Sequence, residues 1–359
     1  MENRVTFSNH PAALAQLVEH LIRNERVAGS NPASGSILKA QNKGSMFNFG
    51  KWSQKAFRFL NLPVRNYPLT GECHHDKNGT SGGDRRNVTR EERIFAMIDK
   101  KGLGLEIGPS HAPLAPKREG YNVHIIDHLD ADGLRQKYKG HHDVNLNNIE
   151  EVDFVWSGEA YPDLIGRTEC YDWIIASHVI EHVPDFLSFL KQCETLLKPS
   201  GILSLAIPDR RYCFDHFNPV TTTGQILDAW ERRSIRPTPG QVFDGIANHV
   251  SSNGAIAWGS GGGGPTEQKG ERLAAAREAY ERALREGAYI DCHCWRFTPA
   301  SFRLIISDLQ AMGLLELGIA REFDSYGCEF YASLTRGTTG LFSSRFEALQ
   351  EIKNEGMIS

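Results

Sequence analysis

Short apolar runs alternate with segments of helical periodicity from residue 103 onward. The runs are rich in Val, Ile and Leu, end at turn residues and lie at 103–107, 121–127, 153–156, 172–176 and 202–207. Runs of this length and composition predict strands buried on both faces. Between the last two, Pro184 and Asp185 open a helical period that ends at 198–201. Strand, helix and strand in this order predict a parallel sheet with right-handed crossovers.

The C-terminal part has a different pattern. Thr298 and Pro299 predict the start of a helix that ends at Gly313, with an apolar stripe of Phe302, Ile305, Ile306 and Leu309. Two strands are predicted at 314–319 and 329–335, joined by a turn near 324–327. The sequence therefore predicts an α/β fold whose mostly parallel sheet closes with an antiparallel hairpin.

Residues 1–45 have no sustained period and contain a Gly, Ser, Pro and Asn stretch at 29–36. Residues 15–20 and 29–32 back-translate to the D-arm and T-arm sequences of a tRNA gene. We therefore interpret 1–45 as a spurious extension, with translation starting at Met46; a real disordered leader or a short helix at 14–22 is the alternative.

The rest of the chain divides into an N-terminal segment with a linker at 46–90, a main domain at 91–340 with an insertion at 210–295, and a tail at 341–359. The aromatic and basic stretch 46–64 predicts a short amphipathic helix that docks on the core or touches a membrane surface. The polar, Gly-rich stretch 70–87 predicts a linker.

Charge, the length of the apolar runs and the cysteines limit which partners and which cellular compartment are expected. Forty basic and 44 acidic side chains give a net charge of −4, which disfavours nucleic acid as a partner. The longest apolar run, 173–180, is far shorter than the roughly 20 residues that span a bilayer, so no integral membrane segment is expected. No signal peptide is recognisable, and the 7 cysteines lack a disulfide framework, which favours a cytoplasmic protein with reduced thiols.

Candidate chemistry begins where the first two predicted strands end. Glu106-Ile107-Gly108 closes the first strand and Asp127 closes the second. A glycine at a strand end lets a ligand approach the backbone, and a carboxylate after the next strand can accept hydrogen bonds from ribose hydroxyls. This pair predicts a nucleotide site at the carboxyl edge of the sheet.

These motifs resemble those of the class I S-adenosylmethionine-dependent methyltransferases, in particular the type 11 methyltransferase domain, over about residues 102–209. Besides Glu106–Gly108 and Asp127, the resemblance includes Asp172–His182 and the turn Lys198–Leu203. It implies a Rossmann-like, seven-stranded sheet and S-adenosylmethionine as cofactor. The family's loop is Gly-x-Gly-x-Gly, whereas this chain continues after its first glycine with Pro109-Ser110-His111-Ala112.

The resemblance also implies roles for single residues. Glu106 and Gly108 would bracket the methionine end of the cofactor. Asp127 would bind the ribose, with His128 and Glu159 near the adenine. Ser177 and His178 would form the floor below the sulfonium, and His178 is the candidate general base for a hydroxyl acceptor. For His182 an architectural role at the helix start is favoured over catalysis.

The insertion at 210–295 leaves the carboxyl edge of the fifth strand and is expected to cover the cofactor cleft and bind the acceptor. It contains Arg210, a candidate acceptor ligand, and a predicted helix at 271–286 with Leu273, Ala276, Tyr280 and Leu284 on its apolar face. At its end, a predicted strand presents Asp291, His293 and Trp295 to the acceptor. Zinc binding by Cys292, His293 and Cys294 is disfavoured because neighbours in an extended segment point to opposite faces, so no metal is predicted.

The sequence therefore predicts an S-adenosylmethionine-dependent methyltransferase that acts on a hydroxyl of a small molecule or a glycan, with glycan-assembly enzymes as possible partners. Two alternatives stay open. One is a non-catalytic cofactor-binding partner of a glycosyltransferase. The other is a nicotinamide-dependent oxidoreductase, for which the glycine-poor loop is less suited.

Overall fold

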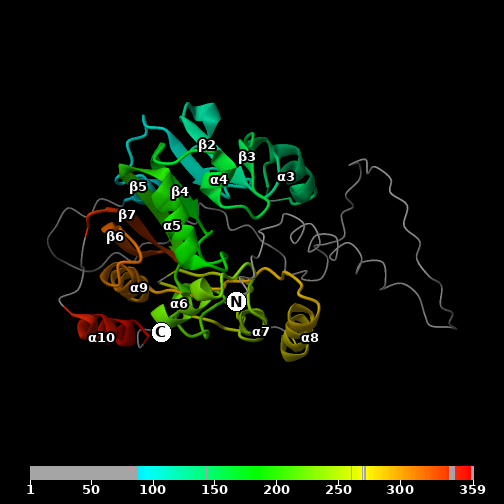
Figure 1. Cartoon of the computed structure of the whole chain (residues 1–359). Coiled ribbons are helices and arrows are strands. Elements are labelled where there is room, and N and C mark those ends of the chain that lie inside the picture. The colour runs from blue at the N-terminus through cyan, green and yellow to red at the C-terminus, as the bar shows by residue number, and fades with distance from the viewer. Residues whose placement is uncertain are drawn as a thin grey trace, which may run out of the picture. The chain divides into compact units, whose positions relative to one another are not determined.

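The computed structural model describes residues 88–142, 144–259, 261–268, 270, 272–338 and 344–356 (Figure 1). The predicted extension at 1–45, the helix at 46–64 and the linker at 70–87 lie outside the described residues.

A seven-stranded sheet forms the centre of the described fold. Its strand order is β3-β2-β1-β4-β5-β7-β6 (Figure 1). The strands are β1 (Gly104–Ile107), β2 (Val123–Asp127), β3 (Phe154–Val155), β4 (Tyr171–Ser177), β5 (Leu197–Pro208), β6 (Leu317–Tyr326) and β7 (Glu329–Arg336). The first five pair in parallel, and β7 pairs antiparallel with both β5 and β6. The predicted fold class, including the closing hairpin, is confirmed.

The inner strands pack as their apolar sequences predict. Leu105 of β1 and Ile174 of β4 are fully buried, and Trp173 of β4 lies over Gly104, where an added Cβ would come within 2.1 Å of the indole ring. Strand β5 starts earlier than predicted. Its pairing with β4 passes from Tyr171↔Leu197 to Trp173↔Ile202, so residues 198–201, predicted as a turn, form a bulge inside the strand.

Helices cover the sheet and build the insertion. The α-helices are α2 (Arg90–Ile94), α3 (Ala131–Tyr138), α4 (Tyr161–Ile165), α5 (Phe186–Leu196), α6 (Thr223–Glu231), α7 (Pro239–Ala247), α8 (Arg272–Arg285), α9 (Pro299–Ala311) and α10 (Arg345–Glu355). Short 3-10 turns lie at Lys117–Glu119, Leu146–Asn148 and Arg210–Tyr212. Of the helices in the described ranges, none has the length and apolar character needed to cross a membrane.

Local capping explains where the two best-predicted helices begin. Asp185 caps α5 by accepting a hydrogen bond from the Ser188 amide, and Thr298 caps α9 in a reciprocal pair with Ser301. The predicted C-terminal tail contains α10, which packs beside α9 in Figure 1. Glu355 of α10 accepts hydrogen bonds from the Ala300 amide at the start of α9.

Two predictions for the insertion are wrong. Helix α8 forms, but Leu273 and Leu284 are more than half exposed, because the helix packs on α7 through Ala276 and Ala283. Residues 288–296 form no strand; they are an extended segment held by side-chain and backbone bonds to other parts of the chain.

Candidate active site

The carboxyl ends of β1, β2 and β4 meet at one edge of the sheet, as parallel pairing requires. This edge carries the predicted residues Gly108, Asp127 and Ser177. Gly108 has a φ of +64°, and a Cβ there would lie 3.2 Å from the Val179 side chain. A residue other than glycine would therefore be strained and would narrow the approach to the backbone.

Asp127 is buried at this edge and binds the turn that replaces the usual glycine loop. Its Oδ2 accepts a hydrogen bond from the Ser110 amide at 2.9 Å. Its Oδ1 accepts one from the His128 amide at 2.8 Å and lies 2.5 Å from His128 Nδ1. The His128 ring itself is half exposed. Asp127 and His128 thus lie at the carboxyl end of β2 and contact each other, and their predicted roles at the ribose and the adenine stay predictions.

Glu106 is buried and faces the loop that follows β1. Its two carboxylate oxygens accept hydrogen bonds from the amides of Leu114 and Ala115 at 2.7 and 3.1 Å. Burial raises the pKa of Glu106 to about 7, against the opposing effect of the two amides. In this structure Glu106 fixes the shape of the loop, and its predicted contact with the cofactor stays a prediction.

Glu159 follows β3 in a tight polar turn. Its carboxylate accepts hydrogen bonds from the amide and hydroxyl of Ser157 at 3.0 and 2.9 Å, and its carbonyl accepts one from the Trp156 indole at 2.7 Å. Burial favours the neutral acid of Glu159, but hydrogen bonds from its own amide and from the hydroxyl and amide of Ser157 outweigh burial and lower its pKa. The side chain therefore belongs to the same carboxyl edge, at the end of the sheet beyond β2.

His178 follows β4 in a left-handed conformation with a φ of +53°, an unusual one for a non-glycine residue. Its Nε2 lies 2.7 Å from Oε2 of Glu329 on β7. Glu329 is also paired with Arg90 of α2 and accepts a hydrogen bond from the Tyr331 hydroxyl at 2.8 Å. Arg90 in turn donates to the Ser177 hydroxyl at 2.8 Å.

The charged groups of this cluster shift one another's pKa values. Burial favours the neutral acid of Glu329, but His178 and Arg90 outweigh it and hold its pKa at about 2. Burial disfavours the charged form of His178, yet Glu329 and Glu181 raise its pKa. A carboxylate on one ring nitrogen leaves Nδ1 as the nitrogen of His178 that can exchange a proton with a ligand.

The end of the insertion returns to the sheet beside His182. Asp291 is exposed and lies 3.0 Å from Nδ1 of His182, while His293 is buried with its Nδ1 2.5 Å from Oδ2 of Asp215. Burial favours the neutral acid of Asp215, but His293, Arg296 and Asn218 hold its pKa at about 2. Trp295 is buried in the core and donates to the Val183 carbonyl at 2.6 Å.

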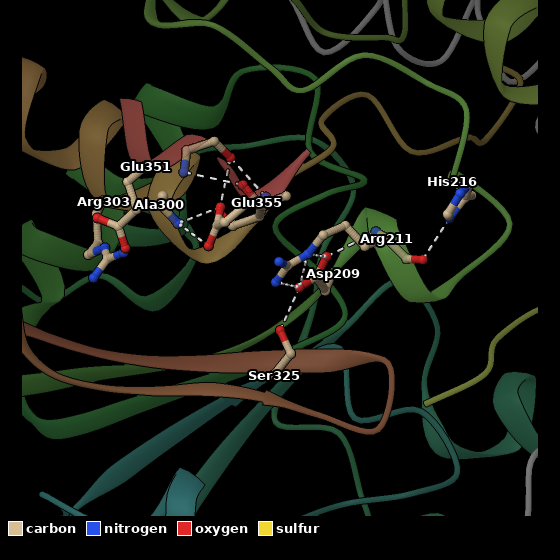
Figure 2. A network of polar contacts seen from close by, with 10 residues as sticks. Asp209, Arg211, His216, Ala300, Arg303, Ser325, Glu351 and Glu355 are labelled. Atoms are coloured by element: carbon tan, nitrogen blue, oxygen red, sulfur yellow. Dashed lines mark hydrogen bonds and ion pairs between the residues drawn. The ribbon is translucent and has the colours of Figure 1, made fainter. Parts of the chain in front are cut away.

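Arg210 lies at the start of the insertion, on the wall of a cavity of about 290 Å³ that also contains His216 and Phe217. It donates to the His216 carbonyl, and burial lowers its pKa. Figure 2 shows the polar network beside this cavity, in which Arg211 forms a bidentate ion pair with Asp209. Asp209 and Arg211 are buried, so the network holds the base of the insertion against the hairpin through Ser325.

Four residues of this edge were missed by the sequence interpretation: Arg90, Glu181, Asp215 and Glu329. Arg90 stands in a capping box of Thr89 and Glu92, a local signal that marks α2 but no partner. Glu181 stood inside the recognised motif without a role. Asp215 and Glu329 meet their partners only through the tertiary fold, so no local pattern indicated them.

A model of a methyltransferase domain family matches residues 83–258. Among curated proteins, the ubiquinone biosynthesis O-methyltransferase of Actinobacillus pleuropneumoniae serotype 7 (strain AP76) is 29% identical over 131 residues, covering 33% of this chain and 50% of the relative. A protein of serotype 5b (strain L20) of the same species matches with equal identity and coverage. The chain thus spans about half the length of the curated relatives it matches.

Solved structures match at low identity. A Burkholderia thailandensis 1,6-didemethyltoxoflavin N1-methyltransferase with bound S-adenosylhomocysteine is 12% identical, with 70% of this chain and 76% of that chain covered and a TM-score of 0.33. A protein described as a Zn-dependent alcohol dehydrogenase from Rhodobacter sphaeroides is 12% identical, with 72% and 92% covered and a TM-score of 0.39. The family assignment depends on the domain match and on the strand order of the sheet. Residues 83–258 match a methyltransferase domain, and the strand order is consistent with a class I S-adenosylmethionine-dependent methyltransferase.

Proposed function

We propose that this protein transfers a methyl group from S-adenosylmethionine to a hydroxyl of a small molecule or glycan. The observation that carries the proposal is the placement of Gly108, Asp127 and His178 at the carboxyl ends of three adjacent parallel strands. Ligands of open parallel sheets bind at this edge. The match to a methyltransferase domain supports methyl transfer over hydride transfer.

The residues at this edge fit the cofactor. Gly108 offers backbone without a side chain, at a φ that only glycine adopts readily. Asp127 keeps lone pairs beyond those used by Ser110 and His128, and these suit the two ribose hydroxyls. Glu106 binds the loop through the amides of Leu114 and Ala115. Glu159 follows β3, and Ser177 ends β4 at the same edge of the sheet. When bound, S-adenosylmethionine supplies a methyl group on a positively charged sulfur.

For the transfer itself, we assign the general base to His178. The acceptor oxygen attacks the methyl carbon, the carbon–sulfur bond breaks with its electron pair going to sulfur, and the hydroxyl proton passes to Nδ1 of His178. Glu329 holds the opposite nitrogen at 2.7 Å, which orients the ring and stabilises the imidazolium that forms. The remaining contribution of the protein is alignment and exclusion of water.

The insertion is proposed to form the acceptor side. Asp291 and His293 stand next to His182 at the start of α5, and Arg210 lines the cavity at the insertion's base. Trp295 would support this side from the core, because its ring is buried against Phe186. Hydrogen-bonding and charged groups of this kind suit a polar acceptor such as a sugar hydroxyl. A cytoplasmic location and association with glycan-assembly enzymes are part of the same proposal.

Calorimetry with S-adenosylmethionine, S-adenosylhomocysteine and NAD separates the candidates. We expect the first two compounds to bind and NAD not to bind. Binding of NAD alone would favour the oxidoreductase. Tight binding of both sulfur compounds without turnover of any acceptor in a methyl-transfer screen would favour the non-catalytic partner of a glycosyltransferase. Release of S-adenosylhomocysteine with a methylated hydroxyl product would establish the proposed activity.

A further inference from the structure

We propose that Glu181, His182 and His293 form a binding site for a divalent transition-metal ion. The three residues come from two distant parts of the chain: Glu181 and His182 from the turn before α5, and His293 from the end of the insertion. Their ligand atoms all lie within 4.8 Å of one another. The sequence interpretation predicted no metal: it assigned His293 to the acceptor side and considered it as a metal ligand only together with its neighbouring cysteines.

The strongest observation is that the side chain of Glu181 is fully buried and that no described residue donates a hydrogen bond to either of its carboxylate oxygens. A buried carboxylate without partners is strongly disfavoured, since it loses the hydration that stabilises its charge. Buried charges in proteins are normally paired or coordinate a metal. The imidazoles of His178, His182 and His293 lie within ion-pair range of Glu181 but donate no hydrogen bond to it, and a metal ion would supply the close partner that its oxygens lack.

The surrounding imidazoles are too far away to be that partner. Nε2 of His182 lies 3.9 Å and Nε2 of His293 lies 4.0 Å from Oε1 of Glu181, beyond hydrogen-bond range. Ligand atoms on one ion at roughly 2.1 Å each lie about 3.0 to 3.6 Å apart. The gap therefore suits an interposed ion after a small inward movement, for which His182 has room because it is partly exposed.

In both histidines a carboxylate contacts Nδ1, the ring nitrogen that faces away from the proposed site. Asp291 lies 3.0 Å from Nδ1 of His182, and Asp215 lies 2.5 Å from Nδ1 of His293. A carboxylate at Nδ1 keeps the proton on that nitrogen and leaves the Nε2 lone pair directed at the site. This pairing of a carboxylate with each ligating histidine is usual around protein-bound metals.

The ligand set indicates the kind of metal. Two imidazoles and one carboxylate favour transition-metal ions such as Zn²⁺, Mn²⁺ or Fe²⁺ over Mg²⁺ and Ca²⁺, which prefer all-oxygen sites. Cys294 does not contribute, because its thiol faces the His182 carbonyl at 3.7 Å. Three protein ligands leave positions open on the ion.

His178 borders the site. Its Nδ1 lies 3.7 Å from the same oxygen of Glu181. If the proposed function holds, an acceptor hydroxyl could occupy an open position of the ion while giving its proton to His178, so that the metal orients the acceptor and lowers the pKa of its hydroxyl. This role depends on the proposed function; the metal site itself does not.

Titration of the metal-free full-length protein with Co²⁺ tests the site without cofactor or acceptor. We expect visible ligand-field absorption that saturates at one equivalent and disappears when Zn²⁺ is added in competition. Glu181→Gln and His293→Ala should each weaken Co²⁺ binding at least tenfold. Absence of saturable absorption, or unchanged affinity in both variants, would overturn the site.

Asp291→Asn and His182→Asn are expected to fold even if the variants at buried positions do not, because both side chains are partly or largely exposed. His182→Asn should weaken Co²⁺ binding at least tenfold, and Asp291→Asn should weaken it roughly ten- to a hundredfold, the usual effect of removing an outer partner of a ligand. His216→Asn is the matched control, since its Nδ1 contacts a backbone carbonyl and no carboxylate, and it should bind Co²⁺ normally. Folded His182→Asn protein with unchanged Co²⁺ affinity would exclude this residue as a ligand and overturn the proposal. Failure of the methyl-transfer screen with intact Co²⁺ binding would affect only the proposed function.

Discussion

Oε1 of Glu181 lies 4.0 Å from Nε2 of His293, although a helix, a strand and most of the insertion separate the two residues in the chain. The backbone carbonyl of Glu181 also accepts hydrogen bonds from the amides of Cys294 and Trp295. The end of the insertion is therefore fastened to the start of α5, immediately after the strand that carries Ser177. Any acceptor held by the insertion is placed against this edge of the sheet by the same contacts.

Replacing Asp127 with alanine should weaken S-adenosylmethionine binding by roughly ten- to a hundredfold. The reason is the loss of at least one of the two proposed hydrogen bonds from the ribose hydroxyls to a charged acceptor, each worth about 1.5 to 3 kcal/mol. Calorimetric titration measures the affinity. Asp132→Ala is the control, because its carboxylate is almost fully exposed on α3 and contacts Arg135. Equal affinity of the Asp127 variant and the native protein would exclude Asp127 as the ribose ligand.

Replacing His178 with asparagine should lower kcat about a hundredfold or more while the affinity for S-adenosylmethionine changes little. A positioned general base contributes roughly 10² to 10⁴ to the rate, and the proposed base does not hold the cofactor. Single-turnover kinetics and calorimetry measure the two quantities. His141→Asn, at an exposed position, is the comparison. A kcat within a few-fold of the native value would show that no base acts from this position.

Glu106 should make the fold less stable as the pH rises. Its pKa in the folded state is about 7, above the ordinary value of 4.5. A raised pKa means that the folded state prefers the protonated form, so this contribution is full below about pH 4.5 and is lost as the pH rises through 7. The loss amounts to roughly 3 kcal/mol at 1.36 kcal/mol per pH unit.

Urea unfolding at several pH values between 4.5 and 8 measures this dependence in the native protein and in Glu106→Gln. The variant cannot ionise, so its stability should vary less over this range. The difference between the two curves isolates Glu106 from the other titrating groups. Parallel curves would mean that Glu106 has an ordinary pKa in the fold.

Gly104→Ala should destabilise the protein by about 2 kcal/mol or more, since overpacking of a tight core typically costs about 1 to 3 kcal/mol. The new Cβ would lie 2.1 Å from the Trp173 ring, so the strand or the indole must move. Urea unfolding measures the change. Gly224→Ala on α6 is the matched control, with its closest neighbour 3.9 Å away, and should be neutral or slightly stabilising. Similar stability of both variants would contradict the close packing of β1 on β4.

The sequence by itself determined the seven strands in their chain order, the helices α5, α8 and α9, and the edge of the sheet that carries the candidate site residues. Strand and helix periods are local properties, and the ends of parallel strands meet at one edge, so the positions of Gly108 and Asp127 at two strand ends were enough to place them together. The caps of α5 and α9 were equally readable, because Asp185 and Thr298 bind amides only three residues away.

Only the tertiary structure decided which charged groups face one another. Glu329 reaches His178 because β7 enters the sheet antiparallel beside β5, and Asp215 and His293 meet when the insertion folds back. The buried face of α8 likewise depended on α7, which covers the small residues Ala276 and Ala283 and leaves the leucines outside. Contacts of this kind join residues far apart in the chain, so a local hydrophobic period, which reports only the neighbours of each residue, carries no information about them.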